Sequence, residues 1–246
     1  MSRGRIALIH GVGLDASMWG PLRGFLEPEF DVQTIELLGH GSREQPAPKG
    51  VGLAELAADV SERLRPGTHL VGFSLGALVA QYLARFRPDL VASLVSVASV
   101  CSRTPEERAS VMTRLASAES DFPATVEASI RRWYPEGSPV PTELVEATRD
   151  VLLRNDPTSF IACYRVFATA DAELAPELPR IAVPSHAVTG ELDPGSTPDM
   201  SARLAAAIPG CTYSIISGAR HMMPVERPQE LANTLTAFIK EHSNVH

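Results

Sequence analysis

A single serine stands between two glycines where a buried strand is expected to turn into a helix. Residues 70–73 form an apolar run that ends in Ser74, and Gly76 begins a stretch of helical composition. A turn this sharp leaves no room for side chains at Gly72 and Gly76. It places the serine hydroxyl at the tip of the turn and leaves the amide of Leu75 unpaired at a helix N-terminus. The pattern alone is also compatible with a serine that only caps the helix.

Apolar runs alternate with helical segments through most of the chain, which predicts an α/β fold with a mostly parallel central sheet flanked by helices and joined by right-handed crossovers. The expected strands are 6–9, 30–37, 70–73, 90–100, 183–189 and 212–216. The expected helices of this part are 53–64, 75–85, 198–207 and 228–240.

The alternation stops between residues 101 and 180. This stretch has helical composition over 104–134, 142–155 and 157–170 and contains no strand-like run. Its place between two strands predicts a helical cap, inserted at about 101–180, over the carboxyl edge of the sheet, where open α/β sheets bind ligands. The expected core is therefore 1–100 together with 181–246, in one structural domain overall, because the cap helices need the core beneath them.

Composition limits the classes of partner. The net charge of −7 is spread without a charge block, which disfavours nucleic acid and anionic membranes. The three cysteines, Cys101, Cys163 and Cys211, are scattered like reduced thiols, and neither a signal peptide nor a membrane-spanning run is evident, so we expect a cytoplasmic protein. Because no His, Asp or Glu cluster has metal-ligand spacing, no metal and no cofactor are expected.

Two late strands each end near a residue that could activate Ser74. Asp193 follows the strand 183–189, and His221 follows the strand 212–216. A serine hydroxyl is a weak nucleophile unless a base takes its proton, and His221 is the predicted base. Asp193 is predicted to hold the second ring nitrogen and to stabilise the imidazolium. The sequence therefore predicts a catalytic triad of Ser74, Asp193 and His221.

The first strand leads into a glycine-rich loop. Residues 10–14 read HGVGL, and the glycines let the backbone approach a reacting carbonyl. The amides of Val12 and Leu75 are the predicted oxyanion hole. His10 is expected to anchor this loop and His40 to fix a later turn, although His10 remains an alternative base.

Other residues compete for the predicted roles. Glu191 lies two residues before Asp193, on the same strand end, and is the rival acid. Asp199 fits the first turn of a helix better than a catalytic site. His186 lies inside a strand, which favours a place in the core or on the sheet surface.

With HGVGL at 10–14, GFSLG at 72–76, GELDP at 190–194 and GARH at 218–221, the chain resembles the α/β-hydrolase superfamily. It is most similar to 3-oxoadipate enol-lactonases and related bacterial esterases and perhydrolases. Cap segments 132–134, 141–153 and 163–171 resemble the lactonase pattern, whereas Arg220 and Glu36 depart from it.

The resemblance implies a cofactor-free hydrolase that cleaves a small carboxylic ester or lactone through an acyl-serine intermediate. A C–C bond hydrolase of ring-cleavage products, or a cofactor-free perhydrolase, is the alternative enzyme on the same fold. A ligand-binding protein that retains the triad is the alternative from another class. The expected partner is a small molecule, and the oligomeric state is left open.

The cap contains a cluster of cations and aromatics at residues 131–134. One interpretation is an amphipathic helix with solvated arginines and Trp133 packed on the core. The other is that one arginine points inward and holds a substrate carboxylate in a bidentate pair. On the second interpretation Arg132 and Trp133 are the predicted substrate-binding residues.

Overall fold

Six parallel strands form the centre of the molecule in the computed structural model, which describes residues 3–43 and 45–243. Their order in the sheet is β2-β1-β3-β4-β5-β6, and every neighbouring pair is parallel. The bounds are β1 (Arg5–Ile9), β2 (Asp31–Ile35), β3 (Thr68–Phe73), β4 (Val91–Val97), β5 (Ser185–Gly190) and β6 (Thr212–Ile216). The predicted α/β class and parallel sheet are confirmed.

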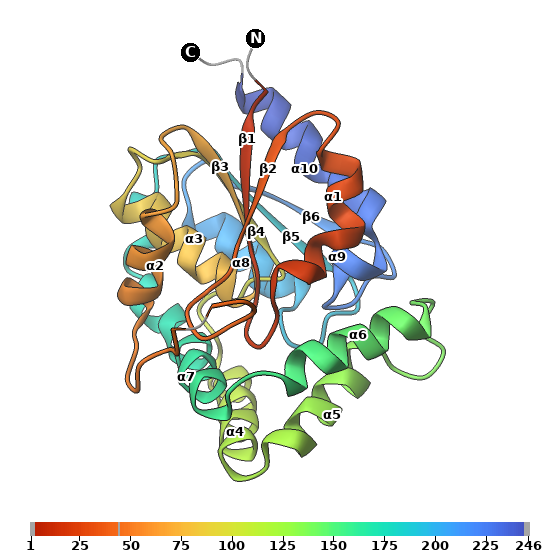
Figure 1. Cartoon of the computed structure of the whole chain (residues 1–246). Helices are drawn as coiled ribbons and strands as arrows, with labels where there is room; N and C mark the ends of the chain where they lie inside the picture. The colour runs from red at the N-terminus through yellow and green to blue at the C-terminus, as the bar shows by residue number, and fades with distance from the viewer. Residues whose placement is uncertain (1–2, 44, 244–246) are drawn as a thin grey trace.

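Helices cover both faces of this sheet (Figure 1). Helices α1 and α10 pack together on one side, and α2 and α3 pack together on the other. These elements and the remaining core helices are α1 (Gly20–Leu26), α2 (Leu53–Ser61), α3 (Leu75–Phe86), α8 (Pro198–Ala207), α9 (Met223–Glu226) and α10 (Pro228–Ser243), with short 3-10 helices η1 (Ala16–Trp19) and η2 (Leu178–Arg180). The sequence did not predict α1, because its seven residues include two glycines and a proline.

The central strands are apolar because both of their faces are covered. All six residues of β3 are buried, and the side chains of Ile6 and Leu8 on β1 are fully buried. Helix α3 packs directly on β3 and β4, and most of its residues are buried as well. The turn that carries Ser74 therefore joins two largely buried elements.

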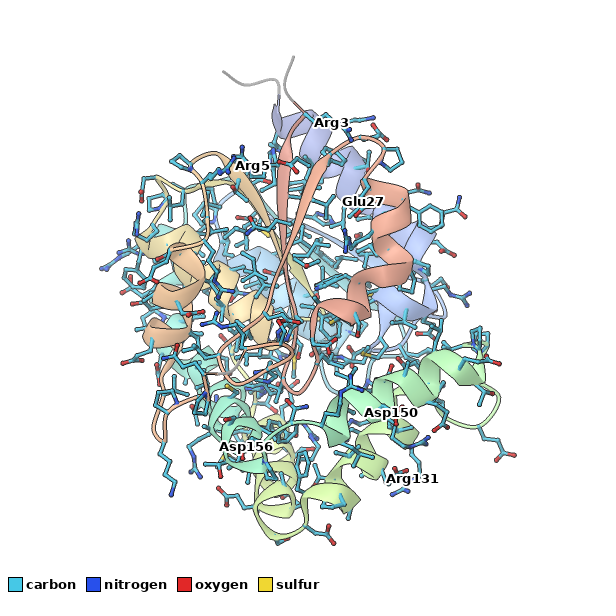
Figure 2. The ribbon with its side chains drawn as sticks, in the orientation of Figure 1. Arg3, Arg5, Glu27, Arg131, Asp150 and Asp156 are labelled. Atoms are coloured by element: carbon cyan, nitrogen blue, oxygen red, sulfur yellow. The ribbon has the colours of Figure 1, made fainter. Side chains whose placement is uncertain are left out.

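Four helices connect β4 to β5: α4 (Pro105–Ser120), α5 (Phe122–Trp133), α6 (Thr142–Leu153) and α7 (Pro157–Leu174). They lie together at the end of the molecule opposite the two termini, beyond the carboxyl ends of the strands (Figure 1). Arg131 and Asp150 mark this end in Figure 2, far from Arg5 at the start of β1. The predicted insertion of a helical cap is confirmed.

Within the cap, the single helical stretch expected at 104–134 is divided into two helices. Asp121 has an extended backbone, with φ −149° and ψ 90°, and its carboxylate accepts from the Ala124 N–H at 2.9 Å. This N-terminal cap satisfies one free amide of α5 and fixes the bend between α4 and α5. In the part of the chain that the structure describes, no helix combines the length and the apolar character that crossing a membrane requires.

Candidate active site

Ser74 lies between β3 and α3 in a backbone conformation that few side chains adopt. Its φ is 54° and its ψ is −113°, and its N–H donates to the Val97 carbonyl at 2.9 Å. A Cβ on Gly72 would lie 2.2 Å from the Gly76 carbonyl oxygen, and a Cβ on Gly76 would lie 2.2 Å from that of Ile9. The two glycines are thus required by the close approach of backbones, which holds the serine in a strained conformation typical of functional sites.

Asp193 and His221 are joined directly. His221 Nδ1 donates to Asp193 Oδ2 at 2.6 Å, and the other carboxylate oxygen accepts from the amides of Gly195 and Ser196 at 2.8 and 2.9 Å. Both side chains are buried, Asp193 at 3% exposure and His221 at 7%. Because the carboxylate is held by three donors, it fixes the orientation of the imidazole and the tautomer with the proton on Nδ1.

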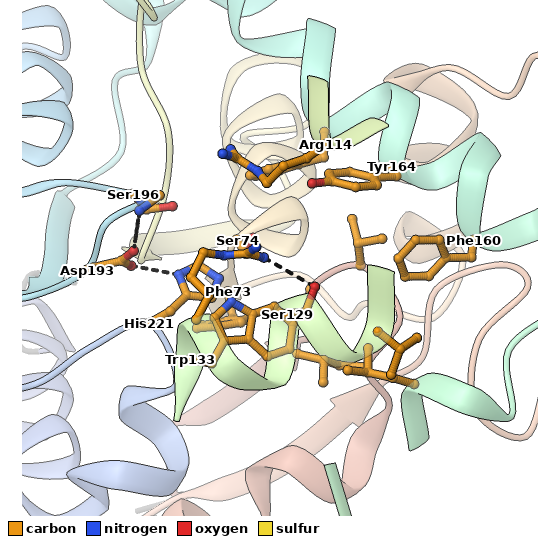
Figure 3. Close-up of a pocket in the computed structure, with 18 residues that line it drawn as sticks. Phe73, Ser74, Arg114, Ser129, Trp133, Phe160, Tyr164, Asp193, Ser196 and His221 are labelled. Atoms are coloured by element: carbon orange, nitrogen blue, oxygen red, sulfur yellow. Dashed lines mark hydrogen bonds and ion pairs between the residues drawn. The ribbon is translucent and has the colours of Figure 1, made fainter. Parts of the chain in front are cut away.

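The ring of His221 is clamped between two aromatic side chains. Phe73 lies with its ring centroid 4.9 Å away, and Trp133 from the cap stacks on the imidazole at 5.5 Å with an interplanar angle of 26°. Ser74 and His221 line the same pocket, which leaves Nε2 as the ring nitrogen available to the serine (Figure 3). The structure thus brings the three predicted triad residues together.

The ends of β5 and β6 approach each other closely enough to set this geometry. A Cβ on Gly190 would lie 2.4 Å from the Ala219 carbonyl oxygen, and the same oxygen accepts from the Leu192 N–H at 2.8 Å. The rival acid Glu191 points elsewhere. Its carboxylate accepts from the Ser217 hydroxyl and the Gly218 N–H, both at 2.8 Å, on the exposed side of the loop.

The glycine-rich loop after β1 passes close to Ser74. Gly11 and Val12 line the pocket, and a Cβ on Gly11 would lie 3.1 Å from the Ser74 Cβ. Leu75 is the first residue of α3. In residues 3–43 and 45–243, neither the Val12 amide nor the Leu75 amide donates to a protein acceptor. Both amides are therefore free to donate to a ligand oxygen, which is what the predicted oxyanion hole requires.

His10 and His40 hold the loops around this site rather than entering the pocket. The Leu37 N–H donates to His10 Nε2 at 3.0 Å, and His10 Nδ1 donates to the Gly11 carbonyl at 2.8 Å. Burial lowers the pKa of His10 to about 4. Burial, and the neighbouring His10 ring at 5.2 Å, lower the pKa of His40 to about 3. Both are neutral at pH 7, and the structure places His10 in the anchoring role.

The pocket has an apolar wall and a cationic end. Helices α5, α6 and α7 and the loop after β1 supply the apolar wall, with Leu14, Val126, Leu152, Phe160 and Phe167. The cationic end is formed by Arg114 and Arg132, whose charges repel each other. The pocket lining also includes the hydroxyl side chains Ser129, Tyr164 and Ser196. Within the described residues no group of His, Cys, Asp and Glu side chains is arranged to bind a metal ion.

Of the paired cap arginines, only Arg132 enters the pocket. Its Nη2 donates to the Ser129 hydroxyl at 3.2 Å, and its guanidinium lies 5.8 Å from the Trp133 ring centroid. Burial lowers the pKa of Arg132, and it forms no ion pair with any described carboxylate. Arg131, by contrast, is exposed and points away from the molecule (Figure 2).

Arg114 lines the pocket, although it was not predicted from the sequence as a pocket residue. The signal was present: on α4 the buried residues Val111, Leu115 and Ala118 form one stripe, and Arg114 interrupts it at helical spacing. A charged residue within a buried helical stripe often faces a cavity.

Known proteins resemble this chain in sequence and in fold. A model of the α/β hydrolase family matches residues 6–234. The chain belongs to the α/β-hydrolase family. Its hydrolase relatives include the (E)-2-((N-methylformamido)methylene)succinate hydrolase of Acinetobacter baylyi, 27% identical over 96% of this chain and 90% of the relative. They also include the pimeloyl-[acyl-carrier protein] methyl ester esterase of Vibrio vulnificus, 28% identical over 95% and 93%.

Among solved structures, this α/β-hydrolase is similar to the enol-lactonase from Burkholderia xenovorans LB400. The TM-score is 0.85 at 26% identity, over 98% of this chain and 92% of that chain. The predicted superfamily, with enol-lactonase-like relatives, is confirmed.

Proposed function

We propose that this α/β-hydrolase is a serine hydrolase that cleaves a small carboxylic ester or lactone. In the proposed reaction the Ser74 hydroxyl attacks the carbonyl carbon while His221 Nε2 takes its proton. The amides of Val12 and Leu75 receive the oxyanion, each donor contributing about 3–4 kcal/mol in comparable sites. The intermediate then collapses to an acyl-Ser74 ester, and the alcohol leaves with the proton from His221.

The second half of the reaction reverses these roles with water. His221 Nε2 takes a proton from water, the resulting nucleophile attacks the acyl carbon, and Ser74 recovers its proton from the imidazolium. Asp193 remains ionised throughout and stabilises the positive charge on the ring. With an ester the alcohol departs before this step, whereas with a lactone it remains attached to the acyl chain.

One observation carries this proposal: the 2.6 Å bond between His221 Nδ1 and Asp193 Oδ2 in the pocket that contains Ser74. It supplies an oriented base in the pocket that the strained Ser74 also lines, which is the arrangement that nucleophilic catalysis needs. Two relatives, named as a methyl ester esterase and an enol-lactonase, act on bonds of this type, which supports an ester or a lactone as the bond cleaved.

We further propose that the substrate bears a carboxylate, held by Arg132. The side chain enters the pocket, it is partly buried, and no described carboxylate forms an ion pair with it, although Asp193 lies close enough to attract its charge. Leaving a buried guanidinium without a counter-ion is unfavourable, and an anionic ligand removes that cost. Its planar fork suits a carboxylate better than a neutral ester.

A serine-directed fluorophosphonate is expected to label Ser74 and no other residue, because only an activated serine beside an oxyanion hole reacts quickly. Intact mass and peptide mapping would locate the adduct. Ser74→Ala is the matched control and should remain unlabelled. An adduct on another residue, or none on the wild type, contradicts the proposed nucleophile.

Replacing Arg132 with alanine is expected to raise the KM for a carboxylate-bearing lactone ~10–100-fold, because a charge-assisted pair contributes roughly 1.5–3 kcal/mol. The KM for the neutral methyl ester of the same lactone should change little. Steady-state kinetics on both substrates would separate the two effects. Arg131→Ala, which removes an equal charge from the exposed face of α5, is the matched control. Equal losses on both substrates count against a carboxylate contact.

A further inference from the structure

A second arginine shares the pocket with Arg132. Arg114, on α4, lines the pocket, and its Nη1 donates to the Ser110 hydroxyl at 2.7 Å. In Figure 3 its side chain enters the cavity near Tyr164, on the side away from Trp133. The two guanidinium groups come from different cap helices and line the same cavity, close enough for their positive charges to repel each other.

Neither of these two arginines has a carboxylate partner among the described residues, although most arginines of the chain do. The arginines that form ion pairs are Arg5, Arg23, Arg43, Arg63, Arg85, Arg87, Arg103, Arg108, Arg149, Arg154, Arg165, Arg180 and Arg203. Two of these lie near Arg114: Arg103 and Arg108 share the buried carboxylate of Asp171. A general shortage of acidic residues does not explain why these two arginines lack ion-pair partners, because the chain has a net charge of −7.

Among the described residues, Asp193 is the only carboxylate that lines the pocket, and its oxygens already accept hydrogen bonds. Asp193 accepts from His221 and from two backbone amides. Arg114 adds to the lowering of the Arg132 pKa by repulsion between the two positive charges. Like charges that face one cavity without a counter-ion oppose stability, and such conflicts concentrate at ligand sites. In addition, the Ser196 hydroxyl is buried on the pocket wall without a hydrogen-bond partner in the described part of the chain.

We propose that the pocket binds substrates with two carboxylates besides the ester or lactone group, one held by Arg132 and the other by Arg114. This inference rests on the proposed hydrolase function and narrows its substrate class. Arg132 adjoins Trp133, which stacks on His221, so it holds the carboxylate closer to the reacting bond. Arg114 holds the second carboxylate on the α4 side of the pocket, where its charge is otherwise unpaired.

Binding of short acids tests this inference independently of turnover. Isothermal titration calorimetry on the full chain would compare glutarate, with two carboxylates, with pentanoate, which has the same number of carbons and one carboxylate. The wild type is expected to bind glutarate ~10–100-fold more tightly, as one additional charge-assisted pair predicts. Equal affinity for the two acids overturns the inference.

Variants assign the two carboxylates to the two arginines. Arg114→Ala should reduce glutarate affinity to within ~3-fold of pentanoate affinity while leaving pentanoate binding close to the wild-type value. Arg132→Ala should weaken both acids, and Arg131→Ala is the charge-matched control. Circular dichroism and a second variant, Arg114→Gln, would exclude a loss of folding. If Arg114→Ala weakens pentanoate and glutarate equally, one carboxylate is shared by both arginines and the second position does not exist.

A parallel assay separates this inference from the proposed function. Hydrolysis of p-nitrophenyl acetate, a neutral ester, should be lost in Ser74→Ala. If wild type and Ser74→Ala hydrolyse it equally, the proposed serine chemistry is wrong, whatever the calorimetry shows. If hydrolysis depends on Ser74 but glutarate binds no more tightly than pentanoate, the hydrolase proposal stands and the dicarboxylate inference fails.

Discussion

Replacing Asp193 with asparagine is expected to lower kcat by ~10³–10⁴-fold without unfolding the chain. The asparagine carbonyl oxygen can still accept from the Gly195 and Ser196 amides, so the loop keeps its hydrogen bonds. Its amide nitrogen, however, would face His221 Nδ1 as a donor. The ring must then carry its proton on Nε2, where it cannot take one from Ser74. Steady-state kinetics with p-nitrophenyl acetate, together with a thermal melt, would measure both consequences.

Glu191→Gln is the matched control for this substitution. The residue lies on the same strand end, but its carboxylate binds Ser217 and Gly218 on the exposed side of the loop. Its loss should change kcat by less than tenfold, because it neither orients the imidazole nor balances its charge. A larger loss with Glu191→Gln than with Asp193→Asn would show that the orienting acid is Glu191.

The meeting of Ser74, Asp193 and His221 in one pocket could be predicted from sequence because each position depends on local rules. Gly72 and Gly76 mark the turn at Ser74, and the resulting clash distances show why no other residue fits there. Asp193 and His221 follow strands whose order along the chain is plain from their apolar runs. Parallel strands end at one edge of a sheet, so residues that follow them meet there. The local sequence patterns and this one rule of sheet topology were enough to predict that the three residues lie together.

The cationic end of the pocket was only half predicted, since it depends on how helices pack. Arg131 and Arg132 are neighbours in sequence, and a rotation of α5 by one residue would exchange their places. Arg114 interrupts the buried stripe of α4, which indicates that it points inward, but the residues that it meets there depend on how the cap helices pack. Side-chain direction on a cap helix is set by its neighbours in space.

The ion pair that joins the start of the cap to its last helix, α7, is the part that sequence hides most completely. Arg103, just after β4, donates to the Asp171 carboxylate at 2.7 Å and to the Phe167 carbonyl at 3.1 Å, and both side chains of the ion pair are almost fully buried. The partners are 68 residues apart in the chain. Only the fold makes one of them the counter-ion of the other, so no spacing rule could have paired them.

The two buried loop histidines predict a loss of stability on mild acidification. In the folded chain the pKa values of His10 and His40 are lowered to about 4 and about 3, mainly by burial. In the unfolded chain each is near 6.5, so below that pH the unfolded state binds protons that the folded state excludes. Their contribution is therefore fully present above about pH 6.5 and decreases as the pH falls toward 4. Between pH 7 and pH 5 each histidine should reduce the free energy of unfolding by about 2 kcal/mol, at 1.36 kcal/mol per pH unit.

Urea denaturation at pH 7 and pH 5 would measure this difference, in a range where most carboxylates remain ionised. His40→Gln should lower the stability at pH 7, because the bond to the Leu38 carbonyl is disturbed, yet it should remove about half of the pH-dependent loss. The change in unfolding free energy between pH 7 and pH 5 reports the protonation of His40, whereas the unfolding free energy at pH 7 also reports the loss of its packing and its hydrogen bond. If the variant and the wild type lose the same free energy between pH 7 and pH 5, then His40 is not excluded from protonation by burial.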